Sequence, residues 1–150
     1  MSINFDNYNN IVSMFFEKSK EMKDKPYLWK KNNNKFESLS WEDIELSVKS
    51  VARSLIDLGV LKGDRVIILS ENRPYWLMSD LAIMNAGGIS VPIFTTYSSN
   101  DYKYILSRLK LKLKLKYLIL KFSLEPIIRR GICSYKSSLI IQFLFYLALF

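Results

Sequence analysis

A strand–helix–strand pattern in the middle of the chain constrains the fold more than any other feature. VIIL at 66–69 is a short, continuous apolar run rich in β-branched residues, typical of a strand covered on both faces. Pro74 suits the first turn of a helix over about 74–86, and ISVPIF at 89–94 predicts the next strand. Two strands joined through one helix over about 30 residues form a βαβ unit with a right-handed crossover. The sequence therefore predicts an α/β fold with parallel strands at about 65–70 and 89–94.

The helix expected between these strands is apolar nearly all round. Asp80 is its only charged residue, so the helix should be covered on several sides. Pro92 has no N–H to donate, which places the second strand at a sheet edge or ends it. A strand covered on both faces and a helix covered all round need more packing partners than residues 1–107 supply. We therefore expect the unit to be the incomplete start of a larger α/β domain.

The residues around this unit predict three further helices and a hairpin. Apolar residues near helical spacing predict a helix over 6–23. The segments 26–31 and 35–39 alternate in polarity and flank three asparagines, which favours a hairpin. Ser40, with an acid three residues later, predicts the capped start of an amphipathic helix, and Ser98 predicts the start of the last one.

Reactive side chains are sparse. The chain has no histidine, which removes His-activated nucleophiles and His metal ligands, and Cys133 as the only cysteine cannot form an internal disulfide or a thiolate metal cluster. Gly87 and Gly88 follow a helix and precede a strand, which is typical of a helix end and not of a phosphate cradle. We identify no catalytic, cofactor-binding or metal-binding residue in the sequence.

The best local polar cluster is Glu71, Asn72 and Arg73, directly after the first parallel strand. Open α/β sheets place ligands at the carboxyl ends of their strands, so this cluster is in a position to contact one. Capping of the next helix is the simpler interpretation. For Asp64 and Arg65, beside the same strand, a turn or an ion pair explains the residues better than catalysis.

Residues 40–107 resemble the N-terminal part of the AMP-forming acyl-CoA synthetases, in the adenylate-forming superfamily. The most specific pieces are GDRVIILSENRPYW, DLAIMNAGGISVPIF and the TTYS that follows. The long-chain fatty acid type is the most similar. The resemblance implies the start of the family's large domain, and a ligase that activates a fatty acid with ATP to an acyl-adenylate and then transfers the acyl group to coenzyme A.

The resemblance also implies ATP, Mg²⁺ and coenzyme A for the full-length family. The family's phosphate loop ending in Pro-Lys-Gly, its Tyr-Gly-x-Thr-Glu element, its ribose-binding Asp and its C-terminal lysine have no counterpart in these 150 residues. No catalytic residue can therefore be carried over. We expect a truncated long-chain fatty acid–CoA ligase that binds none of these cofactors and is inactive by itself.

The composition changes after Ser107. Residues 1–107 contain 13 Lys+Arg and 13 Asp+Glu, whereas 108–150 contain 9 Lys+Arg and one acid, with no Asn or Asp. We therefore divide the chain into an N-terminal piece of an AMP-binding domain, 1–107, and a basic, apolar tail, 108–150. Our preferred interpretation of the tail is an out-of-frame product of a frameshift near residue 107.

Three other interpretations of the tail stay open. LKLKLKLK at 109–116 could be a basic strand, but no aromatic residues interleave with it and we expect no nucleic-acid partner. The apolar run at 138–150 is too short to span a bilayer, although with the lysines it could give peripheral membrane contact through 109–150. The tail could also be a divergent folded strand and helix. The alternative function is a small basic, membrane-associated or interaction protein that reuses the synthetase scaffold, and the expected location is the cytoplasm or its membrane surface.

Overall fold

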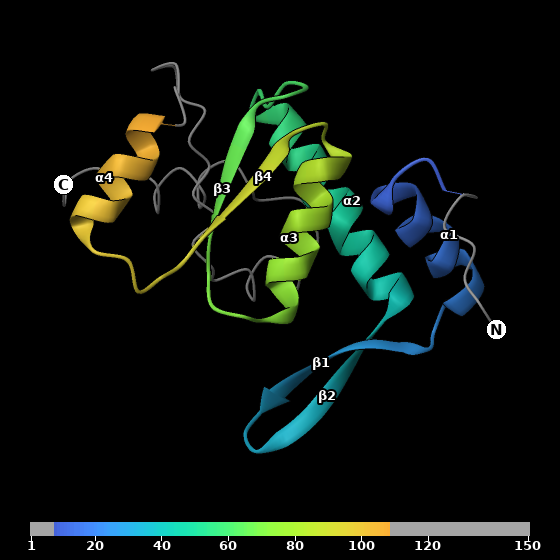
Figure 1. The fold of residues 1–150 in the computed structure, drawn as a ribbon. Coiled ribbons are helices and arrows are strands. Elements are labelled where there is room, and N and C mark those ends of the chain that lie inside the picture. Colours follow the sequence, from blue (N-terminus) through green and yellow to red (C-terminus); the bar gives the residue numbers. More distant parts are fainter. Residues whose placement is uncertain (1–7, 109–150) are drawn as a thin grey trace.

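The computed structural model describes residues 8–108, in which helices and strands are mixed as the α/β prediction requires (Figure 1). The predictions made for the tail lie outside these residues. Along the chain the elements are α1 (Ile11–Met22), β1 (Pro26–Asn32), β2 (Lys35–Ser40), α2 (Trp41–Asp57), β3 (Arg65–Leu69), α3 (Pro74–Asn85), β4 (Ile89–Ile93) and α4 (Ser99–Arg108). Within the described residues the strands form two separate two-stranded sheets, β1–β2 and β3–β4.

Strands β3 and β4 are parallel and α3 connects them, which confirms the predicted βαβ unit. The register runs from Arg65 opposite Ile89 to Leu69 opposite Ile93. In the described part of the chain each strand pairs on one side only, which is the condition under which Pro92 is tolerated in β4. Figure 1 shows α3 packed beside both strands, with α2 behind it.

Helix α3 is buried on several sides, as its apolar composition predicts. It contacts α2, α1, β1 and both parallel strands. Each side chain that it buries fully contributes roughly 1.5–3 kcal/mol relative to exposure. Despite this apolar surface, no helix in the described part of the chain is long and apolar enough to cross a membrane. The buried residues that it shares with α1 and α2 are Phe15, Ile44, Val48, Ala52, Met78, Leu81 and Ala82.

A second buried cluster holds the parallel sheet against the helices. Val66 and Ile68 project from alternate positions of β3, and Ile83 of α3 packs with them. Leu55 near the end of α2 and Val60 in the following loop complete the cluster. All five side chains are at most 7% exposed, so β3 is fixed by tertiary packing as well as by its hydrogen bonds to β4.

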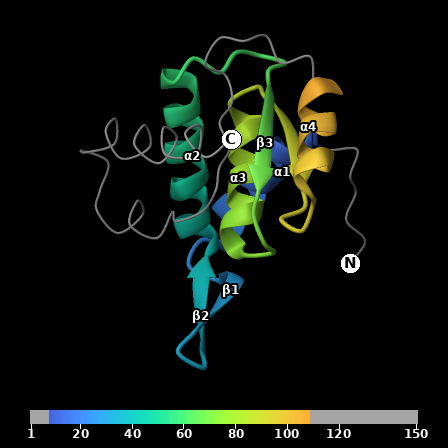
Figure 2. The ribbon, with the colours of Figure 1, turned by 90° about the vertical axis from the view of Figure 1, so that its left-hand side faces the viewer.

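The hairpin predicted around the three asparagines is confirmed. Strands β1 and β2 pair antiparallel, and Asn33 and Asn34 turn the chain with φ of 47° and 62°. Two successive residues with positive φ are typical of the hairpin turns that favour asparagine. At the base of the hairpin Tyr27 stacks on Trp41 with ring centroids 3.7 Å apart. Figures 1 and 2 both show the hairpin projecting away from the helices.

Side-chain caps fix where α1 and α2 begin. The Asp43 N–H donates to Ser40 Oγ at 3.1 Å, which confirms the predicted start of α2. Asn10 and Ser13 form a reciprocal capping box at the start of α1. The helix predicted over 6–23 is therefore shorter at its beginning, because Asn10 has extended backbone and its side chain accepts from a helical N–H.

Candidate functional site

The carboxyl edge of the parallel sheet is the candidate site. Because Leu69 pairs with Ile93, the loops that leave β3 and β4, 70–73 and 94–98, begin next to each other at one edge. Ligands of open α/β sheets bind at such edges. Sequence reasoning singled out only the first loop. The parallel register of β3 and β4 places the second loop at the same edge. It could have been inferred from the predicted parallel pairing of the two strands.

The predicted polar cluster of the first loop is an exposed ion pair. Arg73 Nη2 donates to Glu71 Oε2 at 2.9 Å, and the two side chains are 54% and 68% exposed. Ser70 Oγ donates to the carbonyl oxygen of Glu71 at 2.9 Å. Such an exposed pair is worth about 0–1 kcal/mol, so it shapes the loop more than it stabilises the fold.

The interpretation of this cluster as a helix cap was wrong. Arg73 occupies the N-cap position of α3, but no side chain accepts a hydrogen bond there. Glu71 and Arg73 pair with each other instead. Pro74 stands in the first turn, where it has no N–H for a cap to satisfy and its fixed φ favours the helix by itself.

The second loop ends in a capped helix, as Ser98 predicts. The Ser98 N–H and its Oγ donate to Asp101 Oδ2 at 2.9 Å and 2.7 Å, and the Asp101 N–H donates to Ser98 Oγ at 3.3 Å. The side-chain and backbone hydrogen bonds from Ser98 hold the pKa of Asp101 below its ordinary value. A carboxylate with a lowered pKa is a weak base, so Asp101 is suited to capping and not to proton abstraction.

Aromatic residues dominate the rest of the second loop. Tyr102 Oη donates to the carbonyl oxygen of Phe94 at 2.8 Å. The rings of Phe94 and Tyr97 meet edge to face at 5.4 Å, and those of Tyr97 and Tyr102 at 6.2 Å. These contacts tie the start of α4 to the end of β4. The candidate site thus combines an exposed ion pair on one loop with an aromatic cluster on the other.

The glycines and Asp64 lie at the opposite edge, where the strands begin. Gly87 follows the last turn of α3 with φ of 84°, which confirms the predicted helix end. The Gly88 N–H donates to the carbonyl oxygen of Ile83 at 2.9 Å. Asp64 Oδ2 accepts from the Leu61 N–H at 2.8 Å, which confirms the predicted turn. These residues shape the loops that lead into β3 and β4 and lie away from the candidate site.

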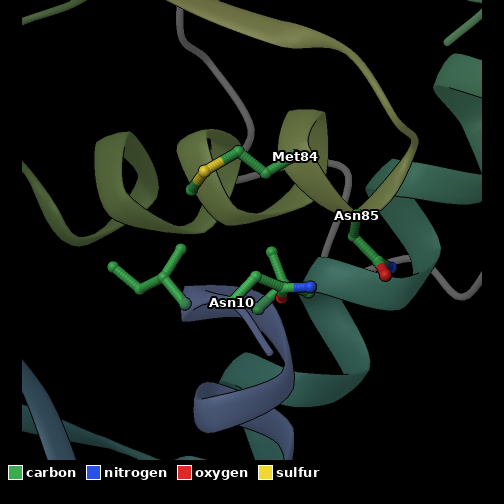
Figure 3. Close-up of a pocket in the computed structure, with 5 residues that line it drawn as sticks. Asn10, Met84 and Asn85 are labelled. Carbon is green, nitrogen blue, oxygen red and sulfur yellow. The ribbon is translucent and has the colours of Figure 1, made fainter. Parts of the chain in front are cut away.

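A shallow hollow of about 390 Å³ lies between α1 and α3 (Figure 3). Figure 3 shows Asn10 at the start of α1 facing Met84 on α3, with Asn85 at the end of that helix. This end of α3 is remote from the loop 70–73 that enters the helix. Ile11 and Val12 complete the lining, which contains no acid, base or nucleophile. The hollow is therefore not the candidate site.

The carboxyl edge does not fit the triphosphate of ATP. The loop 70–73 contains no glycine, so its backbone cannot approach a phosphate in the way that phosphate loops do. Pro74 removes one of the N–H groups that would face the anion, and the Glu71 carboxylate would repel it. Within residues 8–108 no group of three His, Cys, Asp or Glu side chains could hold a metal ion.

Comparisons with known sequences point to one enzyme family. A family model described as AMP-binding enzyme matches residues 15–130, and so continues past Ser107. The long-chain-fatty-acid–CoA ligase FadD15 of Mycobacterium bovis is 29% identical over 99 residues, which are 66% of this chain and 16% of that protein. Fatty acyl-CoA synthetase A of Dictyostelium discoideum is 33% identical over 69 residues, which are 46% of this chain and 10% of that protein. The chain therefore spans at most about a sixth of the length of these relatives.

Comparisons with solved structures show the same fold. The fatty acid AMP ligase of Legionella pneumophila superposes with a TM-score of 0.67 and 19% identity, over 79% of this chain and 25% of that one. The N-terminal subdomain of Klebsiella oxytoca NpsA superposes with a TM-score of 0.64 and 18% identity, over 80% of this chain and 32% of that one. The mixed α/β fold thus matches the N-terminal part of adenylate-forming enzymes, as the sequence predicts.

Proposed function

The chain belongs to the AMP-binding enzyme family, and on that premise we propose that it is the N-terminal scaffold of a long-chain fatty acid–CoA ligase. The reaction is ATP-dependent activation of a fatty acid to an acyl-adenylate, followed by thioester formation with coenzyme A. The family match over residues 15–130 carries the proposal. The two relatives described above are both named as fatty acyl-CoA-forming enzymes, which supports the choice of substrate class.

The 150 residues by themselves are catalytically inactive in this proposal. The family's phosphate loop, Tyr-Gly-x-Thr-Glu element, ribose-binding Asp and C-terminal lysine have no counterpart in the sequence, and the loop 70–73 does not fit a triphosphate. The β3–α3–β4 unit forms one part of the large domain. The phosphate loop that binds ATP belongs to another part of the family's sequence. In the same proposal residues 108–150 are an out-of-frame tail. This part rests on the change of composition after Ser107 alone, because the family match extends to residue 130 and does not support a change of frame at residue 107.

A chimera tests the scaffold role. Residues 8–108 replace the matching segment of the Dictyostelium enzyme, and pyrophosphate release is measured with ATP, Mg²⁺, palmitate and coenzyme A. We expect palmitate-dependent turnover, and a matched chimera carrying Ile83→Asp should lose it because a buried charge disrupts the core. A folded chimera without turnover would contradict the proposed role.

Two simpler measurements test the remaining parts. The purified 150-residue chain should release no pyrophosphate under the same conditions, and clear turnover would overturn its proposed inactivity. For the tail, the gene is read in all three frames. We expect the synthetase sequence with its phosphate loop in another frame downstream, and its absence would rule out the frameshift.

A further inference from the structure

The outward face of the hairpin carries two large aromatic side chains that are uncovered in the described structure. Trp29 is 56% exposed and Phe36 is 69% exposed. The register places Trp29 opposite Ser38 and Lys31 opposite Phe36. Residues paired across an antiparallel ladder project on the same face, and so do residues two apart on one strand. These four residues, all exposed, therefore form one surface, which we call the hairpin face.

The other side of the hairpin packs against the protein core. Leu28 and Leu39 are partly buried against the cluster shared by α1, α2 and α3. On that side Lys30 Nζ lies 3.5 Å from Glu37 Oε2. The hairpin therefore has a packed face and an uncovered face. Two large aromatic residues together on an uncovered face indicate an interaction surface.

The excess of positive charge around the hairpin face indicates an anionic partner. Residues 25–40 contain four lysines and a single acid, Glu37, which is paired with one of those lysines. Lys31 lies on the face itself, opposite Phe36 and two residues from Trp29, and exposed Lys35 lies at the tip of the hairpin next to the turn. Aromatic rings among lysines match a surface that is apolar beneath and anionic above, as in a bilayer that contains acidic lipids.

We propose that the hairpin face docks on an anionic lipid bilayer. Trp29 and Phe36 enter the headgroup region, Lys31 meets the lipid phosphates from the face, and Lys35 reaches them from the tip of the hairpin. The projecting position of the hairpin lets its face reach a flat surface before the helices do (Figures 1 and 2). A nucleic-acid strand would instead need a basic groove along which successive bases stack, which a projecting two-stranded ribbon suits poorly. The proposal does not depend on ligase activity.

Fluorescence of Trp29 provides a site-specific test on the full chain. Trp41 stacks on Tyr27 and Trp76 is partly buried, so Trp29 is the tryptophan most accessible to lipid. The chain is mixed with vesicles of phosphatidylcholine, with and without phosphatidylserine, whose acyl chains are brominated. We expect quenching with phosphatidylserine, and loss of most of it in Trp29→Phe, which keeps an aromatic residue on the face.

Charge variants separate the hairpin from the rest of the chain. The double variant Lys31→Glu/Lys35→Glu should weaken partitioning roughly tenfold or more, since each lysine near an anionic surface is worth about fivefold. The matched control Lys62→Glu/Lys103→Glu changes the net charge equally at exposed positions outside the hairpin, and should change partitioning less than threefold. Far-ultraviolet circular dichroism confirms that each variant is folded.

Four outcomes would overturn the proposal. The first is vesicle binding without quenching of Trp29, which would place the contact elsewhere in the chain. The second is quenching that does not depend on phosphatidylserine. The third is retention by a single-stranded oligonucleotide that the hairpin charge variant abolishes. The fourth is self-association that shields Trp29 from an aqueous quencher, which would make a second copy of the chain the partner.

Discussion

The two sheets of the described structure have the same number of strands but are held in different ways. In β1–β2 the strands are joined by a short turn, and one face stays exposed at Trp29 and Phe36. In β3–β4 the strands are joined through α3, and Val66 and Ile68 are at most 1% exposed. Hydrogen-bonded pairing alone therefore does not fix a sheet in place. The β1–β2 sheet depends on the geometry of its turn, whereas the β3–β4 sheet depends on the packing of the helix that connects its strands.

Removing a core side chain behind the parallel sheet should have the largest effect. Ile83 is fully buried and packs with β3, so Ile83→Ala should lower the free energy of unfolding by about 2–5 kcal/mol through lost burial and a residual cavity. Urea denaturation followed by circular dichroism measures it. Exposed Leu46 on α2 gives the control, and Leu46→Ala should change stability by less than about 0.5 kcal/mol. Equal effects would contradict the dependence of β3–β4 on packing.

The close approach of Gly88 to α3 gives the next effect. A Cβ at Gly88 would lie 3.0 Å from Ile83 Cγ2 and 3.3 Å from the carbonyl oxygen of Asp64. Gly88→Ala should therefore cost about 1–3 kcal/mol. The same denaturation experiment checks this value. If Gly88→Ala is neutral, α3 and β4 separate more easily than their packing indicates.

The junction between the hairpin and the helical body should respond moderately. Ser40 ends β2 and caps α2 through the Asp43 N–H. Ser40→Ala should cost about 1 kcal/mol in the free energy of unfolding, because a helix N–H loses its acceptor. Ser38→Ala, at an exposed position of the same strand, is the matched control and should be near neutral. A larger loss at Ser38 would show that the hairpin and not the cap limits stability.

The smallest effect is expected at the turn of the hairpin. Asn34 has φ of 62°, a conformation that glycine adopts without strain. Asn34→Gly should stabilise the hairpin by a few tenths of a kcal/mol, in keeping with the preference for Asn-Gly in such turns. Hydrogen exchange of β1 and β2 amides should slow, while exchange in β3 stays unchanged. Slower exchange in both sheets would show that the two regions open together.

Local chemistry explains which parts of the fold could be predicted. The asparagine turn, the Ser40 and Ser98 caps and the glycine after α3 act within a few residues, so the sequence pattern is enough to place them. The βαβ unit was predictable because an apolar helix between two apolar runs leaves few alternatives. The start of α1 was placed too early, since apolar spacing does not register the Asn10 cap.

Features that depend on how loops and side chains lie relative to one another in the fold were not predicted from the sequence. The Glu71–Arg73 pair replaced the expected cap because both side chains could reach each other across the loop, which spacing alone does not reveal. The second loop at the carboxyl edge required the parallel register. The exposure of Trp29 was not predictable either, because alternation along a strand separates two faces without saying which one packs. No catalytic site residue was expected, and that expectation remains a prediction.

The βαβ connection also bears on how this part of the chain folds during synthesis. Residues 65–69 pair with residues 89–93, so pairing of the two strands closes a short segment of chain that contains only α3. Closing a segment of this length costs less entropy than closing a longer one, although parallel strands pair more slowly than a hairpin. We expect this unit to form as soon as β4 leaves the ribosome. In a longer polypeptide, later strands would then add to an edge that is already in place.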